Sequence, residues 1–185
     1  MISGIEIIEQ VKLGNITINP FDPKQAGPNS YDLRLGPEIA RVVGNARIGP
    51  EFACSDVIDT HVPGSIIYEK MLDNGAFILL PGELYLGHTV ETIGSKYYAP
   101  LLHGRSTAAR FGIMVHLTAG FGDVGWIGKY VLELRNMTPY PILVYPCDRI
   151  CQVEFEQVRN AELYKSTYQN QNGIMPAKGL QDEAF

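Results

Sequence analysis

The most constraining feature of this chain is a succession of short apolar segments separated by turn residues at intervals of about ten residues. The predicted strands span residues 30–35, 66–71, 76–80, 84–90, 97–102, 113–117, 129–134, 142–145 and 150–155. Many short strands at this spacing are typical of an all-β sandwich, barrel or jelly roll. The sequence therefore predicts a mainly β fold.

Two local signals refine this prediction. Ser3 and Glu6 have the spacing of a capping box, and the apolar residues around them predict one N-terminal helix that ends near Gly14. The helical signal nearly vanishes after that point. Further along, Asn74-Gly75 joins the segments 66–71 and 76–80 and predicts a β-hairpin between them.

Length and composition describe one folded domain. The 185 residues are 45% hydrophobic and 19% charged, which predicts a single globular domain over residues 1–185. The stretch 157–185 is polar, contains glycine and has weak periodicity, so it is predicted to be a mobile C-terminal arm. A net charge of −5 disfavours binding to a nucleic-acid polymer, although a few converging arginines could still hold a small anion.

The cysteines and the N-terminus indicate the cellular setting. Cys54, Cys147 and Cys151 are odd in number and lack the spacing of a disulfide framework, so they are predicted to be reduced thiols in a cytoplasmic protein. The first residues include no basic region, and no apolar run is long enough for a membrane span. Neither a signal peptide nor a membrane partner is expected.

Residues 103–133 carry the densest chemistry in the chain. Within them, Arg105, Ser106, Thr107 and Arg110 belong to a short loop in which Ser106 is predicted to cap the start of a helix. Free amides at a helix start attract phosphate, and the planar fork of arginine donates two parallel hydrogen bonds to it. A capped surface turn with solvated arginines is the alternative for these residues.

Glu133 lies on a predicted strand whose side chains alternate between two faces. The first face holds Tyr130, Leu132 and Leu134, and the second holds Val131 and Glu133. If the first face is core, Glu133 projects into a pocket or a subunit interface, where partial desolvation suits a general base or proton shuttle. The alternative is a structural ion pair, for example with Arg110 or Arg135.

Four glycines surround Asp123 within residues 120–128. Glycine lets the backbone approach a ligand closely, so Asp123 could bind a sugar hydroxyl or position a water molecule. The alternative is a turn aspartate that caps its own backbone. Trp126, in the same segment, is expected to pack against the protein rather than to stack on a ligand.

No zinc site is expected. The segment 146–151 resembles the Pro-Cys-x-x-Cys of zinc nucleoside deaminases but is one residue too long, and none of the four histidines begins a His-x-Glu. Cys147 and Cys151 are therefore predicted to be strand residues. The chain also lacks a P-loop and a G-x-G-x-x-G motif, which excludes the common nucleotide folds.

An ordered set of motifs resembles the superfamily of dCTP deaminases and trimeric dUTPases, on the dCTP deaminase branch. The motifs are NP at 19–20, SYDLRLG at 30–36, LPGE at 80–83, GRSTAAR at 104–110, VHLTAG at 115–120, DVGW at 123–126, VLE at 131–133 and YQNQNG at 168–173. Each motif is modest alone, but their order is specific and covers most of the chain. The resemblance implies a distorted jelly-roll, dUTPase-like β-barrel with an N-terminal helix, which forms a homotrimer with active sites between subunits.

The same resemblance implies zinc-independent hydrolysis of dCTP to dUTP and ammonia. Glu133 matches the catalytic carboxylate, which takes a proton from water and passes it towards the base. The positions that match substrate-binding residues of the family are Arg105, Ser106, Thr107, Arg110, Ala119, Asp123, Val131, Gln152, Tyr164 and Gln171. The arm at 157–185 would close over the nucleotide, and Mg²⁺ would be carried by phosphate oxygens rather than by protein ligands.

Two positions depart from the family pattern. Thr167 stands where a lysine that contacts phosphate is common, so Lys165 or Lys178 would have to substitute for it. Gly122 stands where an isoleucine is usual, which predicts a more flexible loop.

Gly120-Phe121 bears on whether one reaction or two takes place. TAGF at 118–121 resembles members that deaminate dCTP and then cleave dUTP to dUMP and pyrophosphate, which would feed dTTP synthesis. Deaminase-only relatives more often carry His-Arg at the last two places. The alternatives are a monofunctional dUTPase, which the loop around Asp123 also fits, and a non-catalytic dNTP-binding trimer, which the intact Glu133 disfavours. The expected ligands are dCTP and dUTP, with dTTP as a candidate inhibitor.

Overall fold

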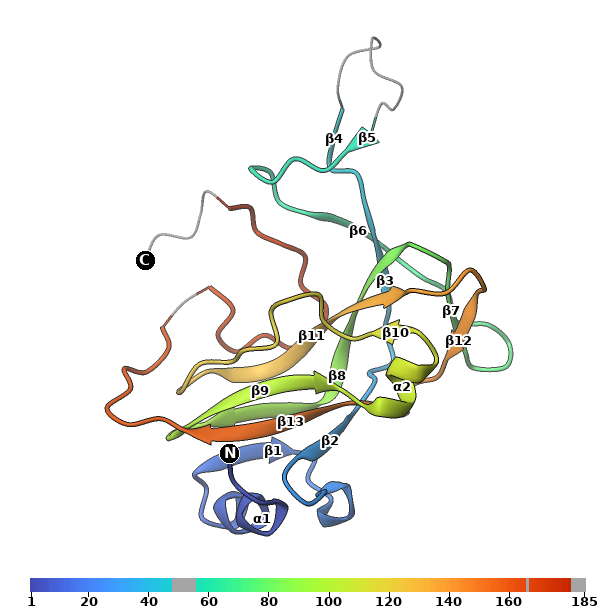
Figure 1. Ribbon diagram of the computed structural model, residues 1–185. Coiled ribbons are helices and arrows are strands. Elements are labelled where there is room, and N and C mark those ends of the chain that lie inside the picture. Colours follow the sequence, from blue (N-terminus) through green and yellow to red (C-terminus); the bar gives the residue numbers. More distant parts are fainter. Residues whose placement is uncertain (48–55, 166, 181–185) are drawn as a thin grey trace.

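The computed structural model describes residues 1–47, 56–165 and 167–180, and it confirms a mainly β chain with an N-terminal helix (Figure 1). The helices are α1 (Gly4–Lys12), η1 (Pro23–Gln25, a 3-10 helix) and α2 (Ser106–Arg110). The strands are β1 (Ile16–Asn19), β2 (Tyr31–Arg34), β3 (Ala40–Val43), β4 (Ala46–Arg47), β5 (Asp56–Val57), β6 (Ser65–Tyr68), β7 (Phe77–Leu79), β8 (Leu84–Ser95), β9 (Tyr98–Gly104), β10 (Ile113–Met114), β11 (Ile127–Asn136), β12 (Ile142–Val144) and β13 (Arg149–Gln157).

Antiparallel pairing joins the strands into two main sheets. In the first, β11 lies between β10 and β8, β3 and β6 continue beyond β8, and β1 also pairs with β8. In the second, β13 lies between β2 and β9. The pairs β7–β12 and β4–β5 are separate two-stranded sheets.

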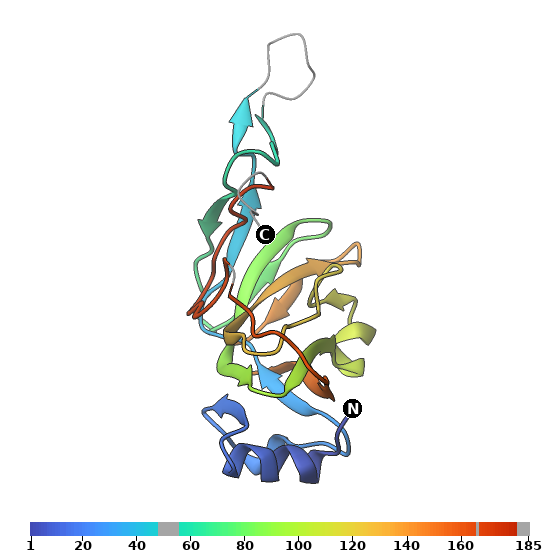
Figure 2. The same ribbon diagram turned by 90° about the vertical axis from the view of Figure 1, so that its left-hand side faces the viewer.

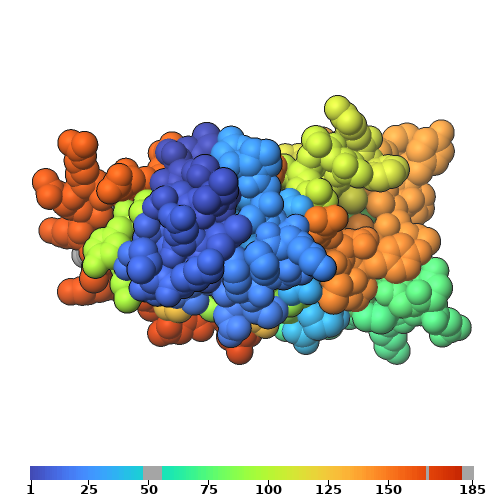
Figure 3. Space-filling view, turned by 90° about the horizontal axis from the view of Figure 1, so that it is seen from below, coloured from blue at the N-terminus to red at the C-terminus, as the bar shows by residue number. Residues whose placement is uncertain are grey.

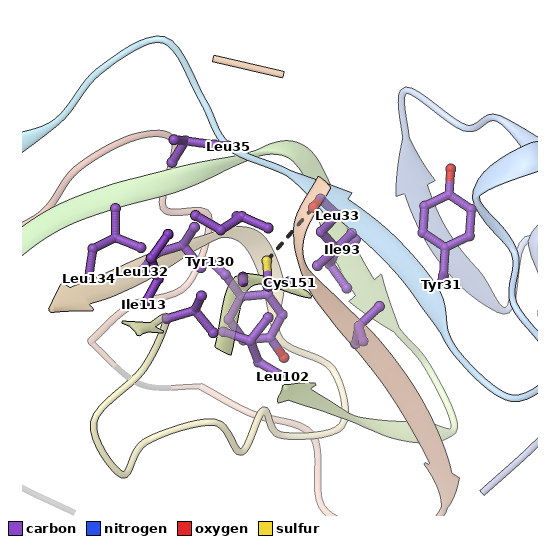
Figure 4. Close-up of a cluster of buried hydrophobic side chains, with 14 of the residues drawn as sticks. Tyr31, Leu33, Leu35, Ile93, Leu102, Ile113, Tyr130, Leu132, Leu134 and Cys151 are labelled. Carbon is purple, nitrogen blue, oxygen red and sulfur yellow. Dashed lines mark hydrogen bonds between the residues drawn. The ribbon is translucent and has the colours of Figure 1, made fainter. Parts of the chain in front are cut away.

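The core forms where the apolar faces of the two main sheets meet. Figure 4 shows Ile93 of β8 and Leu132 of β11 close to Leu33 of β2 and Cys151 of β13, all of which are buried. Burying one such aliphatic side chain contributes about 1.5–3 kcal/mol. The core therefore fixes the orientation of β11, whose opposite face is free to carry chemistry.

Helix α1 forms as the capping box predicts. The Ser3 hydroxyl accepts a 3.2 Å hydrogen bond from the main-chain N–H of Glu6, and the chain leaves the helix through Gly14 at φ +70°. Ile7 is fully buried, and the Ile2 N–H donates to the Phe155 carbonyl of β13 at 3.0 Å. Seen from below, the N-terminal residues, coloured blue, lie together on this face of the molecule (Figure 3).

The predicted hairpin at Asn74-Gly75 is wrong. The turn itself is present, since Gly75 has φ +81° and the Leu72 N–H donates to the Ala76 carbonyl at 2.8 Å. However, β6 pairs with β3, and β7 pairs with β12. Asn-Gly therefore reverses the chain locally without joining the two strands beside it.

Other differences lie at strand ends and in the cysteines. The strand expected over 113–117 is only Ile113–Met114, and β1 and β3 were not predicted. Cys151 is a strand residue of β13, as predicted, but Cys147 lies in the preceding turn at φ +68°. Both thiols are free, and Cys54 lies outside the described residues.

Two segments extend from the sheets and meet each other. Strands β3 and β6 lead to β4 and β5, which form an arm that stands away from the body in both views (Figures 1 and 2). The C-terminal segment runs back along this arm, where the Gly64 N–H donates to the Ala177 carbonyl at 2.7 Å and the Leu180 N–H to the Thr60 carbonyl at 2.8 Å. Within the described ranges, no helix is long and apolar enough to cross a membrane.

Candidate active site

A pocket of about 570 Å³ opens on the outer face of β11. Strand β11 contributes Tyr130, Val131 and Glu133, and the loop before it contributes Leu117, Ala119, Phe121, Gly122, Asp123 and Trp126. The C-terminal segment contributes Tyr164, Tyr168, Gln171, Met175, Pro176 and Ala177. The remaining lining residues are Leu84 and Leu86 of β8, and Val42, Ile58, Gly64, Ser65 and Ile66 from the segment that runs from β3 to β6. Small-molecule sites usually measure about 300–1,000 Å³, mostly apolar with a few polar groups. The pocket matches that description.

Strand β11 presents Glu133 to this pocket. Tyr130, Leu132 and Leu134 are 7%, 0% and 0% exposed, whereas Val131 and Glu133 are half-buried, so the predicted alternation is confirmed. The period of two in a strand sends every second side chain to the same face. Burial of the apolar face therefore forces Glu133 outwards.

A main-chain donor holds the Glu133 carboxylate. The Leu117 N–H donates a 2.8 Å hydrogen bond to Oε2 of Glu133. In the described part of the chain, neither Arg110 nor Arg135 forms an ion pair with Glu133, so the structural salt bridge considered for this residue is not formed. The carboxylate thus has one oxygen in a fixed hydrogen bond and lines an accessible pocket.

The loop 117–126 is anchored to β9 through two glycines. The Leu102 N–H donates to the Gly120 carbonyl at 2.6 Å, and the Gly122 N–H donates to the Pro100 carbonyl at 2.8 Å. Ala119, just before these anchors, and Asp123, just after them, line the pocket. Gly122 is buried, so the glycine expected to loosen this loop is instead packed against its neighbours.

Aromatic residues form one wall. Trp126 packs against Tyr130, with ring centroids 4.8 Å apart and ring planes 44° apart, as expected for a packing tryptophan. Its indole N–H also donates to the Tyr168 carbonyl at 2.9 Å. Trp126 therefore links the loop to the C-terminal segment.

The C-terminal segment docks along the start of β11. The Lys129 N–H donates to the Gln171 carbonyl at 2.9 Å, and the Gln171 side-chain amide donates to the Lys129 carbonyl at 2.6 Å. Tyr164 lies beside the pocket, and its main-chain N–H donates to the Val124 carbonyl at 2.8 Å. Gln171 and Tyr164 thus line the same pocket as Glu133.

A lysine from further along the tail reaches the position of Thr167. The ammonium of Lys178 donates to the Thr167 carbonyl at 2.9 Å and lies 5.5 Å from the centre of the Tyr168 ring. Of the two lysines expected to replace the missing one at 167, Lys178 is therefore the one held beside it.

Five predicted site residues lie outside this pocket. They are Arg105, Ser106, Thr107 and Arg110, which form α2 and its N-cap, and Gln152 of β13. Ser106 does not cap α2, because the N-cap residue is Arg105 and no side chain forms a capping hydrogen bond. That part of the prediction is wrong, since the helix begins one residue earlier than the Ser106 hydroxyl would require.

Arg105 and Gln152 are held by local contacts. Arg105 Nε lies 2.9 Å from Oδ1 of Asp32, and its Nη1 donates to the Arg149 carbonyl at 3.0 Å. The Gln152 side chain accepts from the Ser30 hydroxyl at 2.8 Å and donates to the Gly104 carbonyl at 3.2 Å. One protomer therefore has two separate groups of predicted site residues, one rich in arginine and one around Glu133.

Sequence reasoning missed several groups at the pocket. The Leu117 N–H is a main-chain donor, so no side-chain pattern could have marked it. Ile66 was predicted only as an apolar strand position, Ile58 was assigned to no element, and the presence of both with Met175 at one pocket depends on tertiary packing. Among the described residues, no group of three or more histidine, cysteine, aspartate or glutamate side chains could hold a metal ion.

Comparisons with known proteins complete the description of this site. Residues 1–158 match the sequence model of the family described as dCTP deaminase-like. The "dCTP deaminase, dUMP-forming" of Clostridium beijerinckii is 39% identical over 184 residues, which cover 98% of each chain. The enzyme of the same name from Cytophaga hutchinsonii is 39% identical over 180 residues, covering 96% of this chain and 95% of its own.

A solved structure supports the same fold. The 2'-deoxycytidine 5'-triphosphate deaminase of Agrobacterium tumefaciens aligns with a TM-score of 0.58 and 21% identity over 83% of this chain. The alignment covers 45% of that longer chain.

Proposed function

The chain belongs to the dCTP deaminase-like family, and from that premise we propose that it converts dCTP to dUMP, ammonia and pyrophosphate. One water replaces the amino group at C4 of cytosine, which leaves as ammonia. A second water attacks the α-phosphorus, and the bond to the β-phosphate breaks. Relatives of 35–39% identity over nearly the full length are named for the dUMP-forming reaction, which supports both steps.

The observation that carries the chemistry is the Glu133 carboxylate at the pocket. Glu133 takes a proton from the water that attacks C4 and delivers it to the departing amino group, as a general base and then a general acid. The Leu117 N–H keeps the ionised oxygen Oε2 in place, which favours a single orientation of the carboxylate. Such positioned proton transfer typically contributes about 10²–10⁴-fold in rate.

The base and sugar of dCTP fit the remaining pocket residues. The main chain at Ala119 and the side chain of Val131 contact the base, and Asp123 accepts a hydrogen bond from the sugar hydroxyl. Tyr164 and Gln171 belong to the arm 157–185 of the single domain 1–185, and this arm closes over the bound nucleotide. Its docking along β11 supports that role.

The triphosphate is bound by Arg105, Ser106, Thr107, Arg110 and Gln152 of a second protomer. Their separation from the Glu133 pocket within one chain supports a homotrimer whose active sites lie between subunits. Mg²⁺ travels on the phosphate oxygens, which a hard cation prefers, and the pocket carboxylates Asp123 and Glu133 are too few to form a protein cage. The enzyme uses no zinc, acts in the cytoplasm, and dTTP is a candidate inhibitor.

Product analysis on dCTP with Mg²⁺ tests the proposal. Equal amounts of ammonia and pyrophosphate, with dUMP as the nucleotide product, are expected. Accumulation of dUTP with ammonia alone would mean that Gly120-Phe121 does not support the second step. Cleavage of dUTP without action on dCTP would indicate a monofunctional dUTPase, and tight dNTP binding without turnover would indicate a binding trimer.

A further inference from the structure

Position 122 requires glycine because another side chain occupies the space that a Cβ atom would need. A Cβ atom at this position would lie 2.5 Å from the Tyr130 hydroxyl oxygen and 2.9 Å from both Cγ and the carbonyl oxygen of Pro100. Its backbone is not among the glycines with positive φ, so conformational freedom is not the reason for the glycine. The Tyr130 hydroxyl thus fills the volume that a larger residue at 122 would need.

The Tyr130 hydroxyl and the Gly122 amide meet at one acceptor. The Pro100 carbonyl accepts from the Tyr130 hydroxyl at 3.1 Å and from the Gly122 N–H at 2.8 Å. Since Pro100 belongs to β9 and Tyr130 to β11, this carbonyl ties the loop to two strands of different sheets. Burial raises the pKa of the Tyr130 phenol above its ordinary value, so the hydroxyl remains a donor throughout the neutral range.

Tyr130 also contacts the other end of the same loop segment. Its ring packs against Trp126, and Gly122 and Trp126 flank Asp123 on either side. Asp123 itself is exposed within the pocket, and no hydrogen bond in the described residues holds its carboxylate. The position of Asp123 therefore depends on the backbone on either side of it, and Tyr130 contacts both sides, at Gly122 and at Trp126.

From these contacts we propose that Tyr130 is a positioning residue. It fixes the position of Asp123 in the pocket, so that the Asp123 carboxylate can bind the sugar hydroxyl of the nucleotide. This inference rests on the proposed function. A 2′-deoxynucleoside 5′-triphosphate has one free sugar hydroxyl, at C3′. Tyr130 therefore acts on recognition of that hydroxyl, while Glu133 acts on the base.

The test compares two nucleotides in one variant. Tyr130→Phe removes the hydroxyl and keeps the ring against Trp126. Its KM for dCTP is expected to rise about tenfold, the loss of one charge-assisted hydrogen bond, with kcat within about twofold of the parent. For 2′,3′-dideoxy-CTP, which lacks the hydroxyl, the KM of Tyr130→Phe is expected to stay within about twofold of the parent's value for that nucleotide.

Tyr85→Phe is the matched control. Tyr85 is 1% exposed, its hydroxyl accepts a 3.1 Å hydrogen bond from the Leu80 N–H, and neither residue lines the pocket. The Tyr85→Phe variant should lose about as much stability as Tyr130→Phe, without any change in the KM for dCTP. If Tyr130→Phe fails to fold, Gly122→Ala takes its place, because the added Cβ displaces the loop from the Tyr130 hydroxyl and should raise the KM for dCTP selectively.

An equal rise in KM for both nucleotides, or parent-like values in Tyr130→Phe, would overturn the inference. Failure of the proposed function is separable, because it concerns ammonia release by the parent protein. If the parent bound dCTP without turnover, the same comparison would be made with dissociation constants for the two nucleotides by calorimetry.

Discussion

The main-chain N–H of Leu117 lies 2.8 Å from Oε2 of Glu133 and connects the loop after β10 to the outer face of β11. This donor is kept in every substitution of Leu117 except proline, which has no main-chain N–H, so the hydrogen bond depends on the path of the loop backbone. The loop therefore contributes to the site twice, through this hydrogen bond and through the pocket positions Ala119 and Asp123.

Glu133→Gln should abolish proton transfer while it preserves the shape of the side chain. Ammonia release from dCTP is expected to fall by at least about 10²-fold, because the amide is no base. Binding of dCTP measured by calorimetry should stay within a few-fold of the parent. Glu154→Gln, at a half-buried position of β13 that lies outside the pocket and pairs with His103, is the control and should turn over normally. Unchanged ammonia release in Glu133→Gln would contradict the role given to this carboxylate.

Glu91→Ala should destabilise the fold severely. Glu91 is fully buried and accepts hydrogen bonds from Arg34 Nε at 2.6 Å, Arg34 N at 2.9 Å and Gln25 Nε2 at 3.2 Å. Removing one partner of a buried ion pair costs about 3–5 kcal/mol, since the other charge stays unpaired. Urea denaturation measures the loss, and Glu69→Ala, which breaks the more exposed pair with Arg41, should cost about 1 kcal/mol or less. Similar midpoints for the two variants would refute the prediction.

Gln171→Ala should loosen the C-terminal segment. The side chain is 9% exposed and donates to the Lys129 carbonyl, so its loss should cost about 1 kcal/mol of docking free energy. Hydrogen exchange should accelerate at Lys129, whose amide is bonded to the Gln171 carbonyl, and the KM for dCTP should rise about fivefold. Asn172→Ala alters an exposed neighbour and serves as the control. Unchanged exchange at Lys129 would show that the side chain does not stabilise docking.

Alkaline pH should destabilise the protein through two buried groups, the Cys151 thiol and the Tyr130 phenol. Burial raises the pKa of the Cys151 thiol and of the Tyr130 phenol, so both are neutral in the folded state when the unfolded chain has already ionised. Their stabilising effect is complete below the ordinary thiol pKa of about 8.5 and is lost as the pH rises above it. Urea midpoints between pH 7 and 10.5 measure the decline, and Cys151→Ala should shift its onset upwards towards the ordinary tyrosine pKa of about 10. A midpoint that rose with pH would disprove this assignment.

How much of the fold could be predicted depended on the range of the interactions. The capping box at Ser3 and the alternation of β11 are local, and the structure confirms both. The partners of β6 and β7 are β3 and β12, which lie far away along the chain. Asn74-Gly75 specifies the turn but holds no information about those distant partners.

The candidate site divides in a similar way. Ala119, Asp123, Val131, Glu133, Tyr164 and Gln171 were predicted and line or border one pocket. The arginine group on α2 was predicted as part of the same site, but a single chain does not bring it there. In the proposed homotrimer, contacts between subunits would unite the two groups, and spacing within one sequence does not specify such contacts. Tyr130 was read as core only, because its hydroxyl role depends on Pro100 from another strand.

The pocket is lined partly by paired strands and partly by segments outside the sheets. Glu133 belongs to a strand paired with β8, whereas Tyr168 and Met175 come from the C-terminal segment, beyond the residues 1–158 that match the family. Substitutions in that segment leave the pairing of β11 with β8 and the Glu133 carboxylate unchanged. Under the proposed function, changes in this segment would alter the surroundings of the bound nucleotide without altering the carboxylate that acts on the base.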